Sequence, residues 1–291
     1  MQANNSLVEA SENQPAIRDL DMVLLYPGAI DGGAEQVIIG LIPEVVQRPE
    51  VTAWAFERTL EPVPVVALLL DVEADALADV VDLCEDWLSS RLVDDPVLVM
   101  PPLVDMPSSG SRENLPWGVR QSKINAAAGA GKLRQHIAQE QAICELALAV
   151  LSNVRDNAWD RKTIAPTLLY TILQHVAGEA QVATVAYQMM QHLLSEHPAK
   201  ETLIRQFRMN AHKLVKADVQ ILLQGATHDE FQSALSTQLD KLKSIMVAQD
   251  VAGNNAFVSA FWKRLAGSIG FTAVEAAYLA CLVASNGRAE Q

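Results

Sequence analysis

The pattern of apolar residues changes partway along this chain, and that change limits the folds open to it. Up to residue 105, short apolar runs alternate with segments that repeat at three- and four-residue steps. Beyond Lys132, every patterned segment has helical spacing alone. Strands grouped in one part of a chain and helices in another are typical of an α+β protein. We therefore predict an α+β fold in which a mixed half precedes an all-helical half.

The mixed half has the sequence pattern of two strand–helix–strand units. Four short runs have the apolar or β-branched composition of strands, at 22–26, 52–60, 63–71 and 97–100. Helical spacing fills 33–47 and 73–92. Only Glu61 and Pro62 separate the second strand from the third, so the two are predicted to form a hairpin. The order βαββαβ is the ferredoxin-like arrangement, in which both helices cover one face of the sheet.

The helical half follows a segment of different composition. Residues 106–131 contain prolines, a Ser/Gly cluster and an Ala/Gly run, so we expect a linker or lid loop there. Helices are predicted at 132–155, 163–177, 179–196, 199–223, 229–250, 254–267 and 272–285. Thr272 and Glu275 have the spacing of a capping box at the start of the last helix. The predicted parts are 1–18 as a flexible N-terminal segment, 19–105 as the ferredoxin-like region, 106–131 as the linker or lid and 132–291 as the helical region.

Composition and charge exclude several classes of function. The chain of 291 residues carries 35 acidic and 22 basic side chains, for a formal net charge of -13. Such a surface repels a phosphate backbone, so no nucleic-acid partner is expected. The densest apolar run ends at Asp71, well short of the ~20 residues of a membrane span, and the polar N-terminal residues lack a signal-peptide pattern. We therefore expect no membrane partner and a cytoplasmic protein, with Cys84, Cys144 and Cys281 as reduced core thiols.

Two short windows match the motifs of a known family. The first lies on the predicted hairpin and contains Phe56, Arg58, Glu61 and Pro64. The second is the last predicted helix and contains Gly270, Thr272, Glu275, Tyr278, Leu279 and Ala280. These windows resemble the lantibiotic dehydratase C-terminal domain, also called the thiopeptide-type bacteriocin biosynthesis family. The predicted layout, a ferredoxin-like half followed by a helical half, also resembles that family.

The chain departs from those members of the family that eliminate glutamate. They carry a histidine and two arginines on the second hairpin strand, where this chain has Val65, Ala67 and Leu69. They also carry a His-Met-x-x-Asn-Arg stretch before the last helix. In the corresponding stretch of this chain, residues 259–268, the only cations are Lys263 and Arg264. Elimination of a glutamyl ester requires cationic donors for the leaving carboxylate and a base for the α-proton. The missing residues make glutamate elimination the weaker expectation.

Other members of the family act alone, near this length, as pyridine synthases of thiopeptide assembly. This resemblance implies a leader-guided enzyme of ribosomal peptide (RiPP) maturation, which joins two dehydroalanines in a formal [4+2] cycloaddition and releases water and the leader peptide. The alternatives are a glutamate-elimination lyase and a non-catalytic protein that binds a precursor peptide. No cofactor is implied, because neither reaction transfers electrons, and no metal site is expected, because the histidines lack ligand spacing. The implied partners are a precursor peptide with its leader, other biosynthetic enzymes and a second copy of the chain.

The candidate catalytic residues come from the family positions and from the most basic helix. Arg58 matches the strand arginine of the family and offers a fork of donors to a peptide carbonyl, although a sheet-edge ion pair explains it equally well. His212 is the candidate general acid or base, because its ordinary pKa of about 6.5 suits proton transfer at neutral pH. Lys263 lies close to where the family carries its catalytic histidine. Tyr278 matches a family position, which a buried core tyrosine also explains.

The candidate substrate-binding residues are Tyr26, Arg205, Arg208, Lys216 and Arg264. Three of them share one helix face with His212, and this face is predicted either to hold an acidic leader peptide or to be an ordinary solvated surface. Tyr26 ends the first strand, where it is placed to reach a cleft between the two halves. Arg264 adjoins Lys263 near the last helix. A cleft lined by Arg58 and by the helix of His212 is therefore the predicted site.

Overall fold

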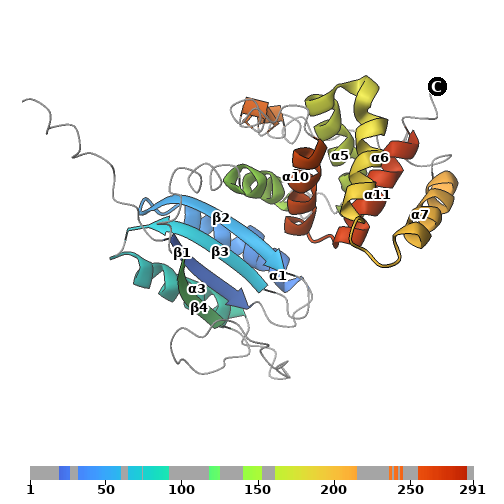
Figure 1. Cartoon of the computed structure of the whole chain (residues 1–291). Helices are drawn as coiled ribbons and strands as arrows, with labels where there is room; N and C mark the ends of the chain where they lie inside the picture. The colour runs from blue at the N-terminus through green and yellow to red at the C-terminus, as the bar shows by residue number, and fades with distance from the viewer. Residues whose placement is uncertain are drawn as a thin grey trace, which may run out of the picture.

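Over its described residues, the chain has a half that contains the sheet and a half that is helical (Figure 1). The computed structural model describes residues 20–26, 32–59, 65–73, 75–91, 118–124, 140–152, 161–214, 236–237, 239–241, 243–244 and 255–286. Over these residues the fold is mixed α+β and mostly helical, which confirms the predicted class. Within the described residues, no single helix has the length and apolarity to cross a membrane, and one pair of helices meets both criteria only when joined across a bend of 119°.

One four-stranded sheet forms the centre of the mixed half. Its strands are β1 (Leu20–Tyr26), β2 (Val51–Thr59), β3 (Val65–Val72) and β4 (Gly118–Ile124). They lie in the order β2-β3-β1-β4, and each neighbouring pair is antiparallel. The predicted pairing of the second and third strands is therefore confirmed, and β2 and β4 are the edge strands.

The fourth strand differs from the prediction. The sequence predicts a strand at 97–100, which lies outside the described residues, and a linker or lid over 106–131. Instead, part of that second segment forms β4, which pairs with β1 along its whole length. Its sequence, GVRQSKI, has only two apolar side chains, so hydrophobic alternation gives no strand signal. Backbone pairing with the central strand β1 makes this segment a strand.

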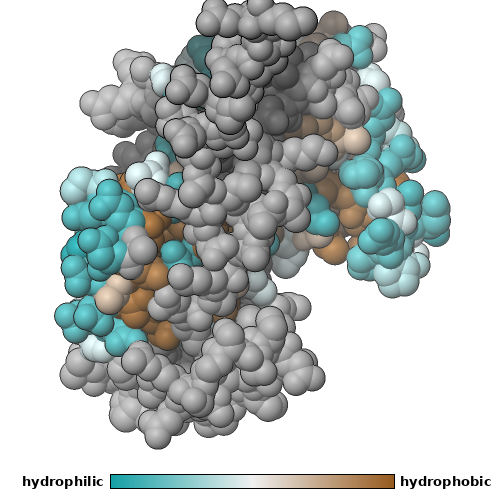
Figure 2. All heavy atoms as spheres, turned by 60° about the vertical axis from the view of Figure 1, so that its left-hand side comes forward, coloured by the Kyte–Doolittle hydropathy of each residue, from teal (hydrophilic) through white to brown (hydrophobic). Residues whose placement is uncertain are grey.

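Helices cover one face of the sheet. They are α1 (Gly33–Gln36), the π-helical segment η1 (Val37–Leu41), α2 (Ile42–Val46) and α3 (Leu77–Arg91). Val23 and Leu25 of β1 are fully buried in the same hydrophobic cluster as residues of these helices. Leu24 and Tyr26, which point the other way, belong to a separate small cluster. In the space-filling view, the coloured residues at the left and right are hydrophilic at the outer margin and apolar further in (Figure 2).

The first helix is wider in its middle than the predicted continuous α-helix over 33–47. The backbone N–H of Ile42 donates to the carbonyl oxygen of Val37, five residues back, which is the π-helical pattern. The next residue, Pro43, has no N–H, and its ring would crowd the carbonyl of Ile39 in a regular α-helix. The wide turn accommodates the proline without ending the helix.

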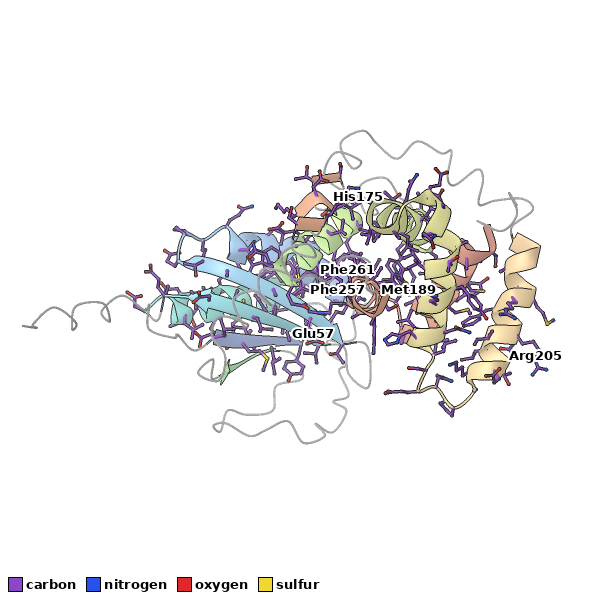
Figure 3. The ribbon with its side chains drawn as sticks, turned by 45° about the horizontal axis from the view of Figure 1, so that its top comes forward. Glu57, His175, Met189, Arg205, Phe257 and Phe261 are labelled. Carbon is purple, nitrogen blue, oxygen red and sulfur yellow. The ribbon has the colours of Figure 1, made fainter. Side chains whose placement is uncertain are left out.

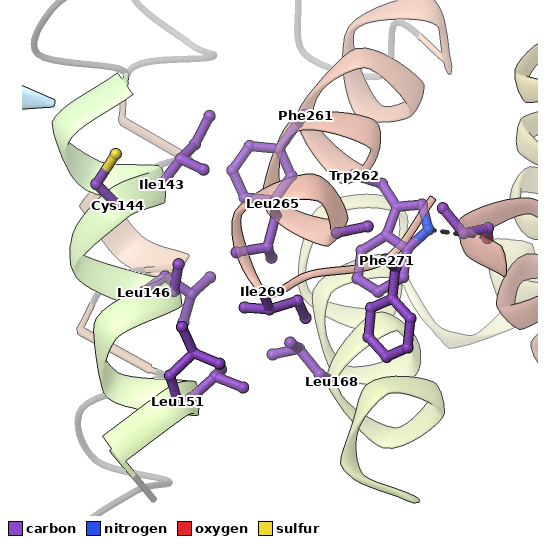
Figure 4. Packing of buried hydrophobic residues seen from close by; sticks show 14 of the residues in the cluster. Ile143, Cys144, Leu146, Leu151, Leu168, Phe261, Trp262, Leu265, Ile269 and Phe271 are labelled. Carbon is purple, nitrogen blue, oxygen red and sulfur yellow. Dashed lines mark hydrogen bonds between the residues drawn. The ribbon is translucent and has the colours of Figure 1, made fainter. Parts of the chain in front are cut away.

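The helical half contains the predicted helices over the described residues. They are a helix at 140–152, α5 (Arg161–Ala177), the 3-10 turn η2 (Glu179–Gln181), α6 (Val182–Leu193), α7 (Lys200–Leu214), α10 (Asn255–Ser268) and α11 (Ala273–Asn286). The predicted capping box at the start of α11 is confirmed: the Thr272 N–H donates to Glu275 Oε2 at 2.9 Å, and the Glu275 N–H donates to Thr272 Oγ1 at 3.2 Å. Trp262 of α10 is fully buried beside α11 and donates to the carbonyl of Ala276 at 3.1 Å (Figure 4).

The two halves share one hydrophobic core. The helix at 140–152 lies between the sheet and α10, and its Ile143 and Leu146 face Phe261 and Leu265 of α10 (Figures 1 and 4). All four residues belong to the hydrophobic cluster that also contains the helix-covered side of the sheet. The halves are therefore joined by packed side chains rather than by a flexible connection.

Polar side chains of the helical half complete the outer edge of β2. The Phe56 N–H donates to Cys144 Sγ at 3.1 Å, and the Phe56 carbonyl accepts from Arg264 Nη2 at 2.7 Å. Arg264 Nε also donates to Glu140 Oε2 at 2.6 Å. Burial raises the pKa of the Cys144 thiol to about 12, so this group stays a neutral donor and acceptor. Side chains thus replace the missing neighbouring strand at Phe56.

Candidate functional site

Three charged side chains from distant parts of the chain meet where the two halves join. Arg58 Nη2 of β2 donates to Glu35 Oε1 of α1 at 2.8 Å, and Arg161 Nη1 of α5 donates to the same oxygen at 2.5 Å. Arg161 Nη1 also lies 3.5 Å from the carbonyl oxygen of Ile269, in the turn between α10 and α11. We call Glu35, Arg58 and Arg161, with Gly270 of that turn, the seam cluster.

Arg58 forms the buried floor of the seam cluster. It pairs with Val66 across β2 and β3, as Phe56 pairs with Leu68, so Arg58 continues the helix-covered face of the sheet. Its side chain is only 7% exposed, against 25% for Glu35 and 34% for Arg161. Arg58 Nε and Nη1 are buried and have no hydrogen-bond acceptor among the described residues. A buried donor without an acceptor costs about 1–3 kcal/mol, so Arg58 keeps donors that a bound polar group would satisfy.

The backbone of Gly270 allows the two arginines to approach each other. The Gly270 N–H donates to the carbonyl of Gly267, and the Phe271 N–H donates to that of Ala266, which is the Schellman ending of a helix. Gly270 has a φ of 93°, in the region that favours glycine. A Cβ at this position would lie 2.6 Å from Nη1 of Arg58 and 2.6 Å from Nη1 of Arg161. Both guanidinium groups therefore converge on a space that only glycine leaves open.

The charges of the seam cluster do not balance. Burial raises the pKa of Glu35, but the Coulombic attraction and hydrogen bond of Arg58, a backbone hydrogen bond and the charge of Arg161 outweigh it, so that the pKa is lowered. Glu35 is thus ionised at neutral pH and offsets one of two positive charges. The cluster therefore holds one positive charge in excess.

The lowered pKa of Glu35 predicts a pH dependence of stability. The Glu35 contribution should be fully present above its ordinary pKa of 4.5 and should be lost as the pH falls through the lower value of the folded state. The Glu35→Gln variant cannot ionise at this position. Its unfolding midpoint should therefore fall below that of the wild type by the largest amount near neutral pH, and the two midpoints should become similar in acid. Urea unfolding of both proteins across this range measures the difference. A difference that stays constant with pH would contradict the assignment.

The structure brings two of the predicted site residues to the junction of the halves. Arg58 lies in the seam cluster, and Arg264 lies nearby in its hydrogen bonds to Glu140 and Phe56. Lys263 is exposed on α10. Tyr26 is buried on the opposite face of the sheet from Arg58, because the neighbouring Leu25 is the residue on the Arg58 side.

The remaining predicted residues lie elsewhere. Helix α7 is at the end of the helical half that is remote from the sheet, and Arg205 points outward there (Figures 1 and 3). Arg208 lies over the ring of Tyr187 of α6 at 5.2 Å, and Tyr278 packs against Phe207 with ring centroids 5.1 Å apart. His212 belongs to α7, and Lys216 lies outside the described residues. The structure therefore does not place Arg58 and the helix of His212 on one cleft.

Sequence reasoning missed Glu35 and Arg161. Glu35 follows a pair of glycines near the start of a helix, and Arg161 begins another helix, so each reads as an ordinary surface charge. The two positions are 126 residues apart, and no local spacing relates them. No local pattern in the sequence marks either residue as part of a site.

Comparison with known proteins relates the fold to two solved structures. No family model matches the chain, and no curated protein matches it. A structure described as the pyridine synthase TbtD from thiomuracin biosynthesis matches with a TM-score of 0.68 at 13% identity, over 94% of this chain and 98% of that one. The structure of TsrL matches with a TM-score of 0.58 at 12% identity, over 93% of this chain and 95% of that one. The chain therefore has, over both of its halves, the fold of these two proteins.

Proposed function

We propose that this protein is a maturation enzyme for thiopeptide-type ribosomal peptides and acts as a pyridine synthase. The observation that carries the proposal is the match to the pyridine synthase TbtD along almost the whole of both chains. It agrees with the resemblance of two sequence windows to the thiopeptide-type bacteriocin biosynthesis family. The substrate would be a precursor peptide with a leader, and the reaction would take place in the cytoplasm without a cofactor.

The proposed reaction joins two dehydroalanines in a formal [4+2] cycloaddition. One dehydroalanine and a neighbouring amide, in its imidic form, act as the four-atom partner, and the second dehydroalanine supplies the two-atom partner. Loss of the ring hydroxyl as water and release of the leader peptide then give the pyridine-type ring. Such chemistry depends mainly on holding the two reacting groups in the correct geometry, with a few donors and acceptors to favour the reactive tautomer.

The seam cluster contains groups suited to those tasks. Arg161, at 34% exposure, can donate to a substrate oxygen while Arg58 lies beneath it. Positioned cationic donors stabilise negative charge that develops on an oxygen during reaction. Glu35, held ionised, can accept a hydrogen bond from the hydroxyl of an imidic tautomer. We therefore propose Arg58, Arg161 and Glu35 as the residues that contact the reacting peptide.

We also propose that the mixed half is a variant of the ferredoxin-like arrangement. The reason is that its strands lie in the order β2-β3-β1-β4 with all neighbours antiparallel, around a first helix and a hairpin in the expected places. In this variant a long connection separates α3 from β4. The proposed site then lies at one end of that sheet, against the turn between α10 and α11.

Glutamate elimination is the second candidate function, and one observation favours it. Elimination needs cationic donors for the leaving carboxylate, and the usual arginines of the second hairpin strand are missing. Arg58 and Arg161 bring two guanidinium groups together from other elements. The same cluster would then stabilise the leaving group rather than the cyclising amide.

Mass spectrometry of purified protein with a dehydrated, azole-bearing precursor peptide tests these functions. Cyclisation releases the leader peptide, elimination from a glutamylated precursor removes the glutamyl mass, and a protein that only binds leaves every mass unchanged. We expect leader release, and for Arg161→Gln a rate reduced by about 10²-fold, as for loss of one positioned donor. The matched control is Arg91→Lys, an exposed arginine over the ring of Trp87, which should keep the wild-type rate. An unchanged precursor would contradict the catalytic proposal.

A further inference from the structure

The seam cluster already holds a carboxylate in the position where a ligand would be recognised. One oxygen of Glu35 accepts from both Arg58 Nη2 and Arg161 Nη1, so the two guanidinium groups are spaced to share one carboxylate group. An arginine offers five donors in a fixed fork that matches carboxylates and phosphates, and the group that these two arginines hold is a carboxylate. The geometry therefore selects for carboxylate chemistry.

Glu35 leaves part of this donor set unused. Among the residues that the structure describes, Arg58 Nε and Nη1 have no acceptor although the side chain is 7% exposed, and Glu35 is the one carboxylate paired with the two arginines. The Glu35 side chain is 25% exposed, so it can rotate toward solvent while both arginines stay in place. An incoming carboxylate with better placed oxygens would satisfy donors that Glu35 does not reach.

We propose that Arg58 and Arg161 form a binding site for a carboxylate group of the peptide substrate, and that this group takes the place of Glu35 on the two arginines, which leaves the Glu35 carboxylate free to accept a hydrogen bond from the peptide. The inference rests on the proposed function only for the source of the ligand, a peptide. Two positions of a peptide supply this chemistry: a side-chain carboxylate of Asp or Glu, and the carboxylate at the C-terminus. Gly270 lacks a Cβ and so leaves room for the two Nη1 atoms to converge. It belongs to the site through this room rather than through a charged interaction.

A chemical rescue experiment tests the site without any peptide. Glu35→Ala removes the resident carboxylate, and acetate should raise the unfolding midpoint of this variant by roughly 2–4 °C above chloride at equal ionic strength. The rise should be smaller in the wild type, where Glu35 competes, and absent in Glu35→Ala/Arg161→Gln. Arg161 is chosen because it is more exposed than Arg58, so its loss should leave the fold intact. Equal effects of acetate and chloride on Glu35→Ala would overturn the proposal.

Binding of precursor peptides to the wild-type protein identifies the source of the carboxylate. One peptide has its acidic side chains replaced by amides, and another has an amidated C-terminus. Neutralising the recognised group should weaken binding about 10- to 100-fold in the wild type and should have little effect in Arg161→Gln. Equal losses in both proteins, or no loss with either peptide, would contradict recognition of a peptide carboxylate here. If acetate stabilises Glu35→Ala but the wild-type protein does not convert the precursor, the carboxylate site is supported and the proposed reaction is refuted.

Discussion

Replacement of Gly270 by alanine should destabilise the protein and abolish the reaction at the seam cluster. The φ of 93° costs a residue with a Cβ about 1–2 kcal/mol. The added Cβ would also lie 2.6 Å from the Nη1 atoms of Arg58 and Arg161, and such overpacking costs about 1–3 kcal/mol. Because both guanidinium groups must move, conversion of the precursor should fall more than the stability alone would explain. Urea unfolding and the mass-spectrometric assay measure the two effects.

Two other glycines separate the causes of this effect. Gly32 lies in the left-handed region, with a φ of 75° and a ψ of 11°, but has nothing within 4 Å of its hypothetical Cβ, so Gly32→Ala should show the backbone strain alone. Gly267 lies in the last turn of α10 with open space and without a positive φ, so Gly267→Ala should be neutral or slightly stabilising. If Gly270→Ala has the same stability and activity as Gly32→Ala, the close approach of the arginines is not what requires glycine.

Trp262→Ala should cause the largest loss of stability among single substitutions in the helical half, about 3–5 kcal/mol. Trp262 is fully buried at the contact of α10 with α11, and its indole N–H donates to the Ala276 carbonyl. The truncation removes a large apolar surface and leaves a cavity beside α11. Chemical denaturation followed by circular dichroism measures the change.

Trp262→Phe provides the graded comparison. It keeps an aromatic ring in the core but removes the hydrogen bond and part of the volume, so it should cost less than the alanine variant. Met209→Ala is the exposed control, because Met209 is 58% exposed and such surface changes stay within about 0.5 kcal/mol. A loss for Trp262→Ala close to that of Met209→Ala would show that the core does not depend on this side chain.

The parts of the fold that could be predicted are those whose signal is local. The aliphatic run that became β3 and the threonine–glutamate pair that caps α11 are each read within a few residues, and both were predicted correctly. The strand β4 was missed because five of its seven residues are not apolar, and only its pairing with β1 defines it. The π-helical turn was missed because the same apolar spacing fits both helix types.

The candidate site was predictable only in part, for a related reason. Arg58 was found from a family motif, but its partners come from elements whose contact depends on the packing of the two halves. Periodicity places residues on a face of one element and contains no information about which distant element covers that face. Glu35 and Arg161 therefore required the three-dimensional structure.

The completion of β2 by Cys144 and Arg264 has a consequence for biosynthesis. Phe56 is synthesised 88 residues before Cys144 and 208 residues before Arg264. Until α10 has emerged from the ribosome, the nascent mixed half exposes an unprotected strand edge, and such an edge can pair with another nascent chain. During that interval the Phe56 N–H and carbonyl lack the side chains that cover them in the folded protein.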